Sequence, residues 1–226
     1  MKKTFFTFLA ISVAIISCKK ETTTPVVVTD KYQTLTANST WNYERTNKLT
    51  TVSENYTLTS TNRDSTVNGR AYHVFTNSSG STNEYYYISG NDYYTFQNLP
   101  ATLVSNPIEN IYLKDNATLN TSWTQSYAIT SSGVPLTITI VNTISDKGLS
   151  KTVNGNVYTD VIHVTSALSA SVLGIPLPAG ALISDVQSYY AKKYGMIQSK
   201  NKINVNYSGI VSNTDEETIL KSADIK

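Results

Sequence analysis

The clearest indication of the fold is the segment Ile203-Asn204-Val205-Asn206-Tyr207-Ser208-Gly209. Its apolar residues, Ile203, Val205 and Tyr207, alternate with polar ones. Neighbouring side chains on a strand point to opposite faces of a sheet, so this pattern gives one apolar face and one polar face. Ser208-Gly209 then provides a turn signal. The segment therefore predicts a half-buried antiparallel strand that ends in a tight turn.

The same alternation recurs along the chain, for example in residues 136–140 and 56–59. Turn signals separate these runs at short intervals, and Asn-Gly pairs are the strongest hairpin signal among them. We predict an all-β domain whose antiparallel sheet of about ten to twelve strands is curled into an open or half barrel or packed as a sandwich. The turn signals are Asn68-Gly69, Ser79-Gly80, Gly90-Asn91-Asp92, Ser132-Gly133, Lys147-Gly148, Asn154-Gly155 and Ser208-Gly209.

Two segments depart from this pattern. Leu173–Gly180 contains two prolines, which a central strand does not accommodate, so we expect a loop or an apolar flap there. The tail, Thr214–Lys226, begins with a sequence that fits either a helix capping box or a terminal strand. We expect the strand, because no other part of the chain has a helical pattern.

The chain contains a weak internal repeat. Thr66-Val67-Asn68-Gly69 recurs 86 residues later as Thr152-Val153-Asn154-Gly155, and Trp41 and Trp123 are 82 residues apart. A duplicated β-meander, with half-repeats 32–113 and 114–226, would produce these offsets. Chance matching in a sequence rich in Thr, Asn and Gly is the alternative.

The first residues form a leader. Lys2 and Lys3 precede an apolar run of twelve residues from Phe5 to Ile16, and the run closes on Ser17-Cys18. As a helix this run rises only about 18 Å, short of a hydrocarbon core of roughly 30 Å. Ile15-Ile16-Ser17-Cys18 resembles the lipobox of bacterial lipoproteins. This resemblance implies that residues 1–17 are a signal peptide and that Cys18 is the lipid attachment site.

Cys18 is the only cysteine, so it has no partner for an intrachain disulfide. A lipid-modified cysteine carries at least two acyl chains, such as palmitate, which anchor a protein stably. We expect residues 18–31 to be a flexible tether and 32–226 a single domain in the cell envelope, anchored to the outer membrane in preference to the inner one. The alternative is a secretory leader cleaved further along, with Cys18 incidental.

Charge narrows the range of partners. Two of the 18 lysines and arginines, Lys2 and Lys3, leave with the leader, so 16 remain against 16 Asp and Glu. A neutral domain lacks the basic excess that binding to nucleic acid requires. We therefore expect the membrane, and a glycan, lipid or protein ligand, as partners.

The sequence contains no catalytic or metal-binding motif. His73 and His163 lie in alternating strand-like segments, without a short-spaced His, Cys or Glu partner. A Gly-x-Ser-x-Gly elbow is absent. The sequence does not exclude a glycosidase-type pair of carboxylates, because such residues can lie far apart along the chain. We predict no catalytic residue, no metal and no cofactor, and hence no enzyme. The acidic residues are expected near turns: Asp64, Asp92, Asp115, Asp146 and Asp215.

The tyrosines form unusual runs, in 85–87, 93–94 and 189–190. Neighbours on a strand face opposite ways, so either both faces of the sheet are covered or one displays aromatic rings. Displayed rings can stack against sugars or acyl chains. We take Tyr86, Tyr94 and Tyr190 as candidate ligand-facing residues. The alternative is that tyrosine, being amphipathic, lines the rim of the core.

The arrangement of Trp-x-Tyr early in the domain and Tyr-Tyr-Ala-Lys-Lys-Tyr-Gly-Met-Ile late in it looks like uncharacterised bacterial lipoprotein families. This resemblance implies an antiparallel sheet curled into an open or half barrel. The chain is more distantly similar to outer-membrane lipoprotein carriers, whose half barrel cradles acyl chains, but it has no pattern for the helices that line their cavity. The residues that carry the resemblance are Trp41, Tyr43, Tyr189, Tyr190, Ala191, Tyr194, Gly195 and Met196.

Three functions therefore compete. The first, which we favour, is a membrane-anchored binding or scaffold module, and a flat exposed row of tyrosines would support it. The second is a lipid-binding half barrel with Leu173–Leu177 as its flap, which a concave, tyrosine-lined apolar cavity with no convergent acids would support. The third is a hydrolase, which two carboxylates facing one cleft would support.

Overall fold

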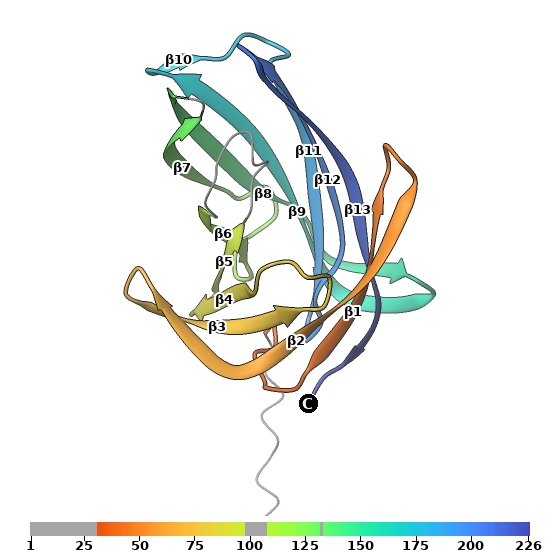
Figure 1. The fold of residues 1–226 in the computed structure, drawn as a ribbon. Coiled ribbons are helices and arrows are strands. Elements are labelled where there is room, and N and C mark those ends of the chain that lie inside the picture. The colour runs from red at the N-terminus through yellow and green to blue at the C-terminus, as the bar shows by residue number, and fades with distance from the viewer. Residues whose placement is uncertain (1–30, 98–107, 132) are drawn as a thin grey trace, which may run out of the picture.

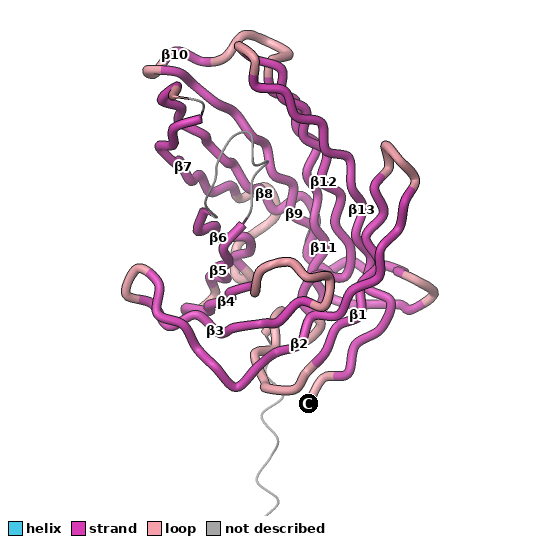
Figure 2. The backbone as a smooth tube through the Cα atoms, viewed as in Figure 1, coloured by secondary structure: helices cyan, strands magenta, loops and turns pink. Residues whose placement is uncertain are grey.

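The computed structural model describes residues 31–97, 108–131 and 133–226, and these form strands and turns without a helix (Figures 1 and 2). The prediction of an all-β antiparallel fold is confirmed. The strands are β1 (Thr40–Asn47), β2 (Val52–Val67), β3 (Arg70–Asn77), β4 (Glu84–Ser89), β5 (Asp92–Gln97), β6 (Ile108–Lys114), β7 (Ser122–Ser131), β8 (Val134–Val153), β9 (Asn156–Val172), β10 (Ile175–Pro176), β11 (Leu182–Ala191), β12 (Gly195–Tyr207) and β13 (Ile210–Asp224).

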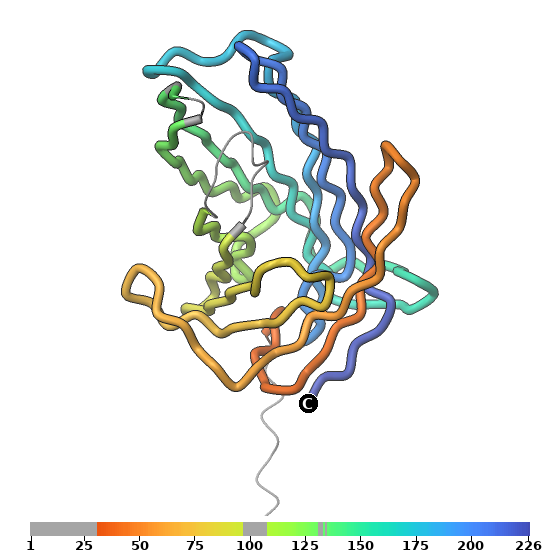
Figure 3. Tube along the Cα trace, viewed as in Figure 1, coloured from red at the N-terminus to blue at the C-terminus, as the bar shows by residue number. Residues whose placement is uncertain are grey.

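The strands form one sheet in the order β6-β5-β4-β3-β2-β1-β13-β12-β11-β9-β8-β7, with the short β10 paired to β9. The sheet is thus two six-stranded meanders, β1 to β6 and β7 to β13, joined where β1 meets β13. It curls until its two edges, β6 and β7, come together (Figure 3). The result is a nearly closed barrel with one unsealed seam, rather than a sandwich. Duplication of the meander stays a prediction.

The junction of β1 with β13 is a regular antiparallel ladder. It runs from Thr40↔Asp224 to Asn47↔Glu216, with one bulge between Asn42 and Tyr43. The tail is therefore a terminal strand, as predicted. Because these residues lie at the two ends of the domain, their pairing is what turns two meanders into one curved sheet.

At the other junction, β6 and β7 form no ladder, and side chains bond the free backbone groups of β6 instead. Trp123 Nε1 donates to the carbonyl of Ile111 over 2.7 Å, and the Ile111 N–H donates to Gln125 Oε1 over 2.8 Å. Asn142 Nδ2 also donates to the Ile111 carbonyl, over 3.0 Å, and the Tyr127 hydroxyl donates to the Glu109 carbonyl. An exposed strand edge needs such partners.

The Asn-Gly hairpins form as predicted. Asn68 and Gly69 have φ of 51° and 77°, and Asn154 and Gly155 have φ of 48° and 79°. Positive φ at both central residues matches the right-handed twist of the flanking strands. Residues 173–180 are mainly turns around β10, and Leu173 and Ile175 are exposed.

Residues 31–39 run along the turns at one end of the barrel. Gln33 forms a bridge with Tyr194, in the turn between β11 and β12, and Trp41 Nε1 donates to the Tyr194 carbonyl over 2.8 Å. Gly195 has a φ of 69°, and a Cβ there would lie 2.3 Å from Gln33 Oε1. The left-handed backbone therefore favours glycine here, and a larger residue would also require the Gln33 side chain to shift.

Candidate binding cavity

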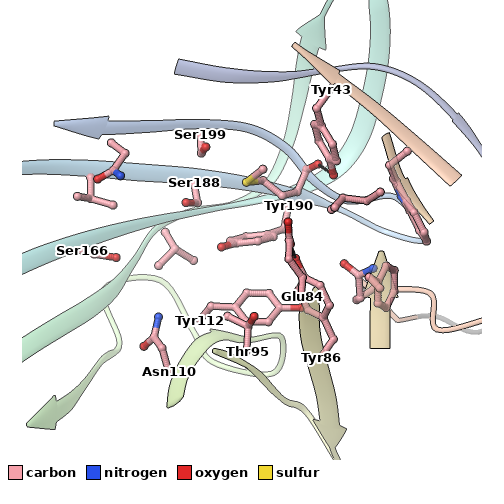
Figure 4. A pocket seen from close by; sticks show the side chains of 18 of the residues that line it. Tyr43, Glu84, Tyr86, Thr95, Asn110, Tyr112, Ser166, Ser188, Tyr190 and Ser199 are labelled. Atoms are coloured by element: carbon pink, nitrogen blue, oxygen red, sulfur yellow. Dashed lines mark hydrogen bonds between the residues drawn. The ribbon is translucent and has the colours of Figure 1, made fainter. Parts of the chain in front are cut away.

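The barrel contains a partly open cavity of about 220 Å³ (Figure 4). One part of its wall is aromatic, and another part carries amides and hydroxyls. The aromatic part comprises Trp41, Tyr43, Tyr56, Phe75, Tyr86, Tyr112 and Tyr190, and the polar part includes Asn110, Asn142, Ser166, Ser188, Ser199 and Asn201.

Strand alternation brings the aromatic residues to the inside. In β4, Glu84 and Tyr86 line the cavity, so Tyr85 and Tyr87 point to the outer face. In β11, Tyr190 lines the cavity while Tyr189 stacks on His163 on the other face. The pattern that places a tyrosine inside therefore also places a glutamate beside it.

Glu84 is the one carboxyl group that lines the cavity among the described residues. The Tyr86 hydroxyl donates to Glu84 Oε2 over 2.7 Å, and Asn77 Nδ2 donates to Oε1 over 3.0 Å. Burial raises the pKa of Glu84, and these two hydrogen bonds and the charge of Arg45 lower it by less. The Arg45 guanidinium is itself held by Glu54 at 2.8 Å. Glu84 is thus a half-buried acid that forms no ion pair with another described residue.

The aromatic wall is a chain of ring contacts. Trp41 and Phe75 have ring centroids 5.5 Å apart, Phe75 and Tyr86 4.9 Å, Tyr86 and Tyr112 6.1 Å, and Tyr112 and Tyr190 5.3 Å. Burial raises the pKa of the Tyr86 and Tyr112 phenols well above 10.0 and that of Tyr190 to about 12. These hydroxyls therefore stay protonated near neutral pH and act as hydrogen-bond donors.

The polar wall centres on Asn142 of β8. Its Oδ1 accepts from the Ser166 hydroxyl over 2.5 Å, and its Nδ2 reaches Asn110 Oδ1 at 3.4 Å in addition to the Ile111 carbonyl. The cavity wall and the seam thus share residues. Nearby, Asn201 Oδ1 is buried and has no hydrogen-bond partner among the described residues. A buried acceptor of this kind is usually satisfied by water or by a ligand.

The three tyrosines singled out from the sequence do not lie together. Tyr86 and Tyr190 line the cavity from opposite meanders. Tyr94 instead contacts the Arg70 guanidinium at 4.7 Å and Tyr87 at 5.5 Å, and its neighbour Thr95 is the β5 residue that lines the cavity. A ligand role for any of the three stays a prediction. Cys18 lies outside the described residues.

Sequence reasoning missed most of the wall. Glu84 had a usable signal, because it stands two residues before Tyr86 and so shares its face. No local sequence signal pointed to three other wall residues, Tyr112, Asn142 and Asn201. Each lies in an ordinary strand pattern and reaches the cavity only through the curvature of the whole sheet.

Two His–Asp pairs lie beside bulges of the long hairpins. His73 Nδ1 is 2.8 Å from Asp64 Oδ1, and His163 Nδ1 is 2.9 Å from Asp146 Oδ2. These two aspartates lie within β2 and β8, and Asp215 lies within β13, so the expectation that they sit near turns is wrong for all three. The bulges shift the register so that each aspartate of a pair stands directly opposite its histidine in the ladder.

Ser60 completes a Ser–His–Asp chain, with its Oγ 3.0 Å from His73 Nε2. The same hydroxyl also bonds the Leu35 carbonyl at 3.0 Å, and Ser60 is fully buried outside the cavity wall. A nucleophile needs access to its substrate. This serine therefore ties residues 31–39 to β2. The described residues contain no group of three or more His, Cys, Asp and Glu side chains that could hold a metal.

The comparisons with known proteins found one similar structure. It is a protein of Parabacteroides distasonis ATCC 8503 that is provisionally assigned as a lipoprotein. The match has 11% identity and a TM-score of 0.49, and it covers 85% of this chain and 98% of that one. No protein-family model and no curated protein matches the chain. Within the described residues, no helix is long and apolar enough to cross a bilayer.

Proposed function

We propose that this chain is a lipid-anchored binding protein of the bacterial cell envelope that holds a small ligand inside its barrel. The observation that carries the proposal is the partly open cavity of about 220 Å³ in the barrel, with an aromatic wall and a polar wall. A concave site with a few convergent polar groups is the usual form of a small-molecule site. We therefore take this cavity as the ligand site of the binding module that the sequence led us to expect.

The polar groups of the cavity argue against an acyl chain as the ligand. The carboxyl group of Glu84 and the hydroxyls of Ser188 and Ser199 would lie against a hydrocarbon that offers no hydrogen bonds. A polar group that loses its water and gains no partner in return costs about 1–3 kcal/mol. The volume also lies below the roughly 300–1,000 Å³ typical of sites for drug-sized ligands. A compact ligand with both apolar and polar parts fits the lining better.

The other two readings find less support. Tyr86 and Tyr190 face the interior, so they form no flat row for a glycan or a protein on the outer surface. A pair of carboxylates is the minimum for glycosidase chemistry, and among the described residues the cavity wall carries only Glu84. We therefore propose binding without catalysis.

The anchor is inferred from the sequence. Cys18 ends a lipobox-like segment, and residues 18–31 lead to the barrel end along which residues 31–39 run. The thirteen residues from Lys19 to Lys31 span roughly 20 Å when flexible, so we expect this barrel end to lie nearest the bilayer. We propose the outer membrane as the site of attachment.

The test is whether the cavity retains a small molecule. The lipidated protein is purified from a bacterial host, denatured, and the released compounds are identified by mass spectrometry. Ser188 lines the cavity and its neighbour Gln187 faces the opposite side of β11, so Ser188→Phe should abolish retention and Gln187→Phe should not. Absence of any retained or added small ligand in the wild type, or equal retention in both variants, would contradict the proposal.

The anchor is tested separately by Cys18→Ala. This variant should move from the membrane fraction to the soluble fraction, because the attachment site for the acyl chains is gone. Retention in the membrane after a high-salt wash would show that Cys18 is not the anchor.

A further inference from the structure

We infer that the ligand of the cavity is a small organic cation, an amine or quaternary ammonium compound, with Glu84 as its counter-ion and the surrounding aromatic rings as its cage. This inference rests on the proposed function, because it names the chemistry of the ligand for the same cavity. Three observations carry it: the charge of the cavity, the arrangement of its rings and its size.

The charge of the cavity is that of a single acid. Among the described residues that line it, the only ammonium group belongs to Lys200, and that group is held by Asp185. Arg45 is the described cation whose charge acts on Glu84, but its guanidinium already pairs with Glu54 at 2.8 Å. The protein therefore holds a half-buried carboxyl group, and among the described residues its hydrogen bonds come from the neutral donors Asn77 and Tyr86. A buried carboxylate is stable when a positive charge accompanies it, and here the ligand provides that charge.

The rings around Glu84 add to this preference. Tyr86 bonds Glu84 directly, and Phe75 and Tyr112 contact the Tyr86 ring at 4.9 Å and 6.1 Å. The faces of aromatic rings carry negative potential and attract ammonium groups, most strongly where water is excluded. An anion would meet the carboxyl group of Glu84. A neutral sugar would leave the carboxylate without a counter-charge.

The size of the cavity fits a compact cation. Since a water molecule takes about 30 Å³ of the liquid, 220 Å³ holds about seven waters. Choline, with about seven non-hydrogen atoms, is of this size, and its hydroxyl can bond an acceptor on the polar wall. The hydroxyls of Ser188 and Ser199, which line the cavity, are such acceptors.

The experiment compares choline with 3,3-dimethyl-1-butanol, which has the same shape but no charge. Each is titrated into the lipidated wild-type protein by calorimetry, in a maltoside detergent that itself carries no ammonium group. We expect choline to bind at least about tenfold more tightly than the uncharged analogue. Equal affinities, or binding of the analogue alone, would overturn the inference without any variant.

Two variants locate the charge. Glu84→Gln keeps the shape of the side chain and should weaken choline binding about tenfold or more, while affinity for the uncharged analogue stays unchanged. Glu44→Gln is the matched control, because Glu44 pairs with Lys221 at 3.5 Å and does not line the cavity. Unchanged choline affinity in Glu84→Gln would contradict the counter-ion role.

The outcome for the ligand class is separate from that for the proposed function. If neither choline nor tetramethylammonium binds, while the purified protein retains a neutral compound that Ser188→Phe excludes, the cation inference is wrong and the binding function stands. If wild type and Ser188→Phe behave alike toward every compound, the binding function itself fails.

Discussion

The two junctions of the barrel are closed by different chemistry. Where β1 meets β13, eight residue pairs form a backbone ladder. Where β6 meets β7, side chains of Trp123, Gln125, Tyr127 and Asn142 bond the backbone of Glu109 and Ile111. A backbone ladder tolerates most side chains, whereas a side-chain closure depends on each residue that makes it. The second junction is therefore the one that single substitutions can open.

The cavity lies against this more sensitive junction. Asn110 and Tyr112 belong to the edge strand β6, and Asn142 both bonds that edge and lines the cavity. On the opposite side, Trp41 and Tyr43 line the cavity from β1, within the regular ladder. One wall of the cavity is thus fixed by backbone pairing, and the other is held by the side chains of the seam.

Removing Trp123 should weaken the molecule most. Its indole is buried and bonds the Ile111 carbonyl, so Trp123→Ala loses both packing and the bridge across the seam. We expect the free energy of unfolding to fall by about 3–5 kcal/mol, measured by chemical denaturation. Trp123→Phe, which keeps a ring but lacks the N–H, should lose about 1 kcal/mol. Equal losses in the two variants would mean that the hydrogen bond, and not packing, dominates at the seam.

Asn142→Leu isolates the polar part of the seam. Asn142 is 1% exposed, and its loss leaves the Ser166 hydroxyl without its acceptor and takes one donor from the Ile111 carbonyl. We expect a destabilisation of about 1–3 kcal/mol. Thr143→Val, one residue along on the exposed face, should stay within about 0.5 kcal/mol. A loss no greater than that of the control would show that these bonds do not hold the seam.

The sequence predicted the strands better than the way they close. Alternation in residues 203–207 and the Asn-Gly turns act over a few residues, and both were correctly interpreted. The pairing of Thr40 with Asp224 has no local signal, because it joins the two ends of the domain. Asn142 has no local signal either, because it bonds β6 only once the curved sheet has brought that edge strand close to it. Alternation indicated that Glu84 and Tyr86 share a face, but not that this face is the interior.

Gly195→Ala tests the end of the barrel away from the seam. The residue has a φ of 69°, and a Cβ there would press on Gln33, which lines the cavity. The left-handed conformation alone costs a non-glycine residue about 1–2 kcal/mol, so we expect a loss of at least this size by denaturation. Gly209→Ala, with a φ of 83° and open space around it, should carry the conformational strain without the clash. Equal losses would show that the contact with Gln33 is not tight.

The smallest effect we predict is a change in how stability depends on pH. Burial raises the pKa of Glu84 above 4.5, although Asn77, Tyr86 and Arg45 act in the opposite direction. The folded protein then keeps a proton that the unfolded chain releases, so this group lowers stability as the pH rises from about 4.5 through the raised pKa. Glu84→Gln removes this decrease. Denaturation at a series of pH values should therefore show the variant gaining on the wild type across this window, and parallel curves would contradict the assignment.

Native-state hydrogen exchange compares the two junctions most directly. The backbone amides of β6 and β7 should exchange through local openings at lower free energy than those of β1 and β13, and Trp123→Ala should widen this difference. Equal protection at both junctions, in the wild type and in the variant, would contradict the conclusion that the barrel is closed by a backbone ladder on one side and by side chains on the other.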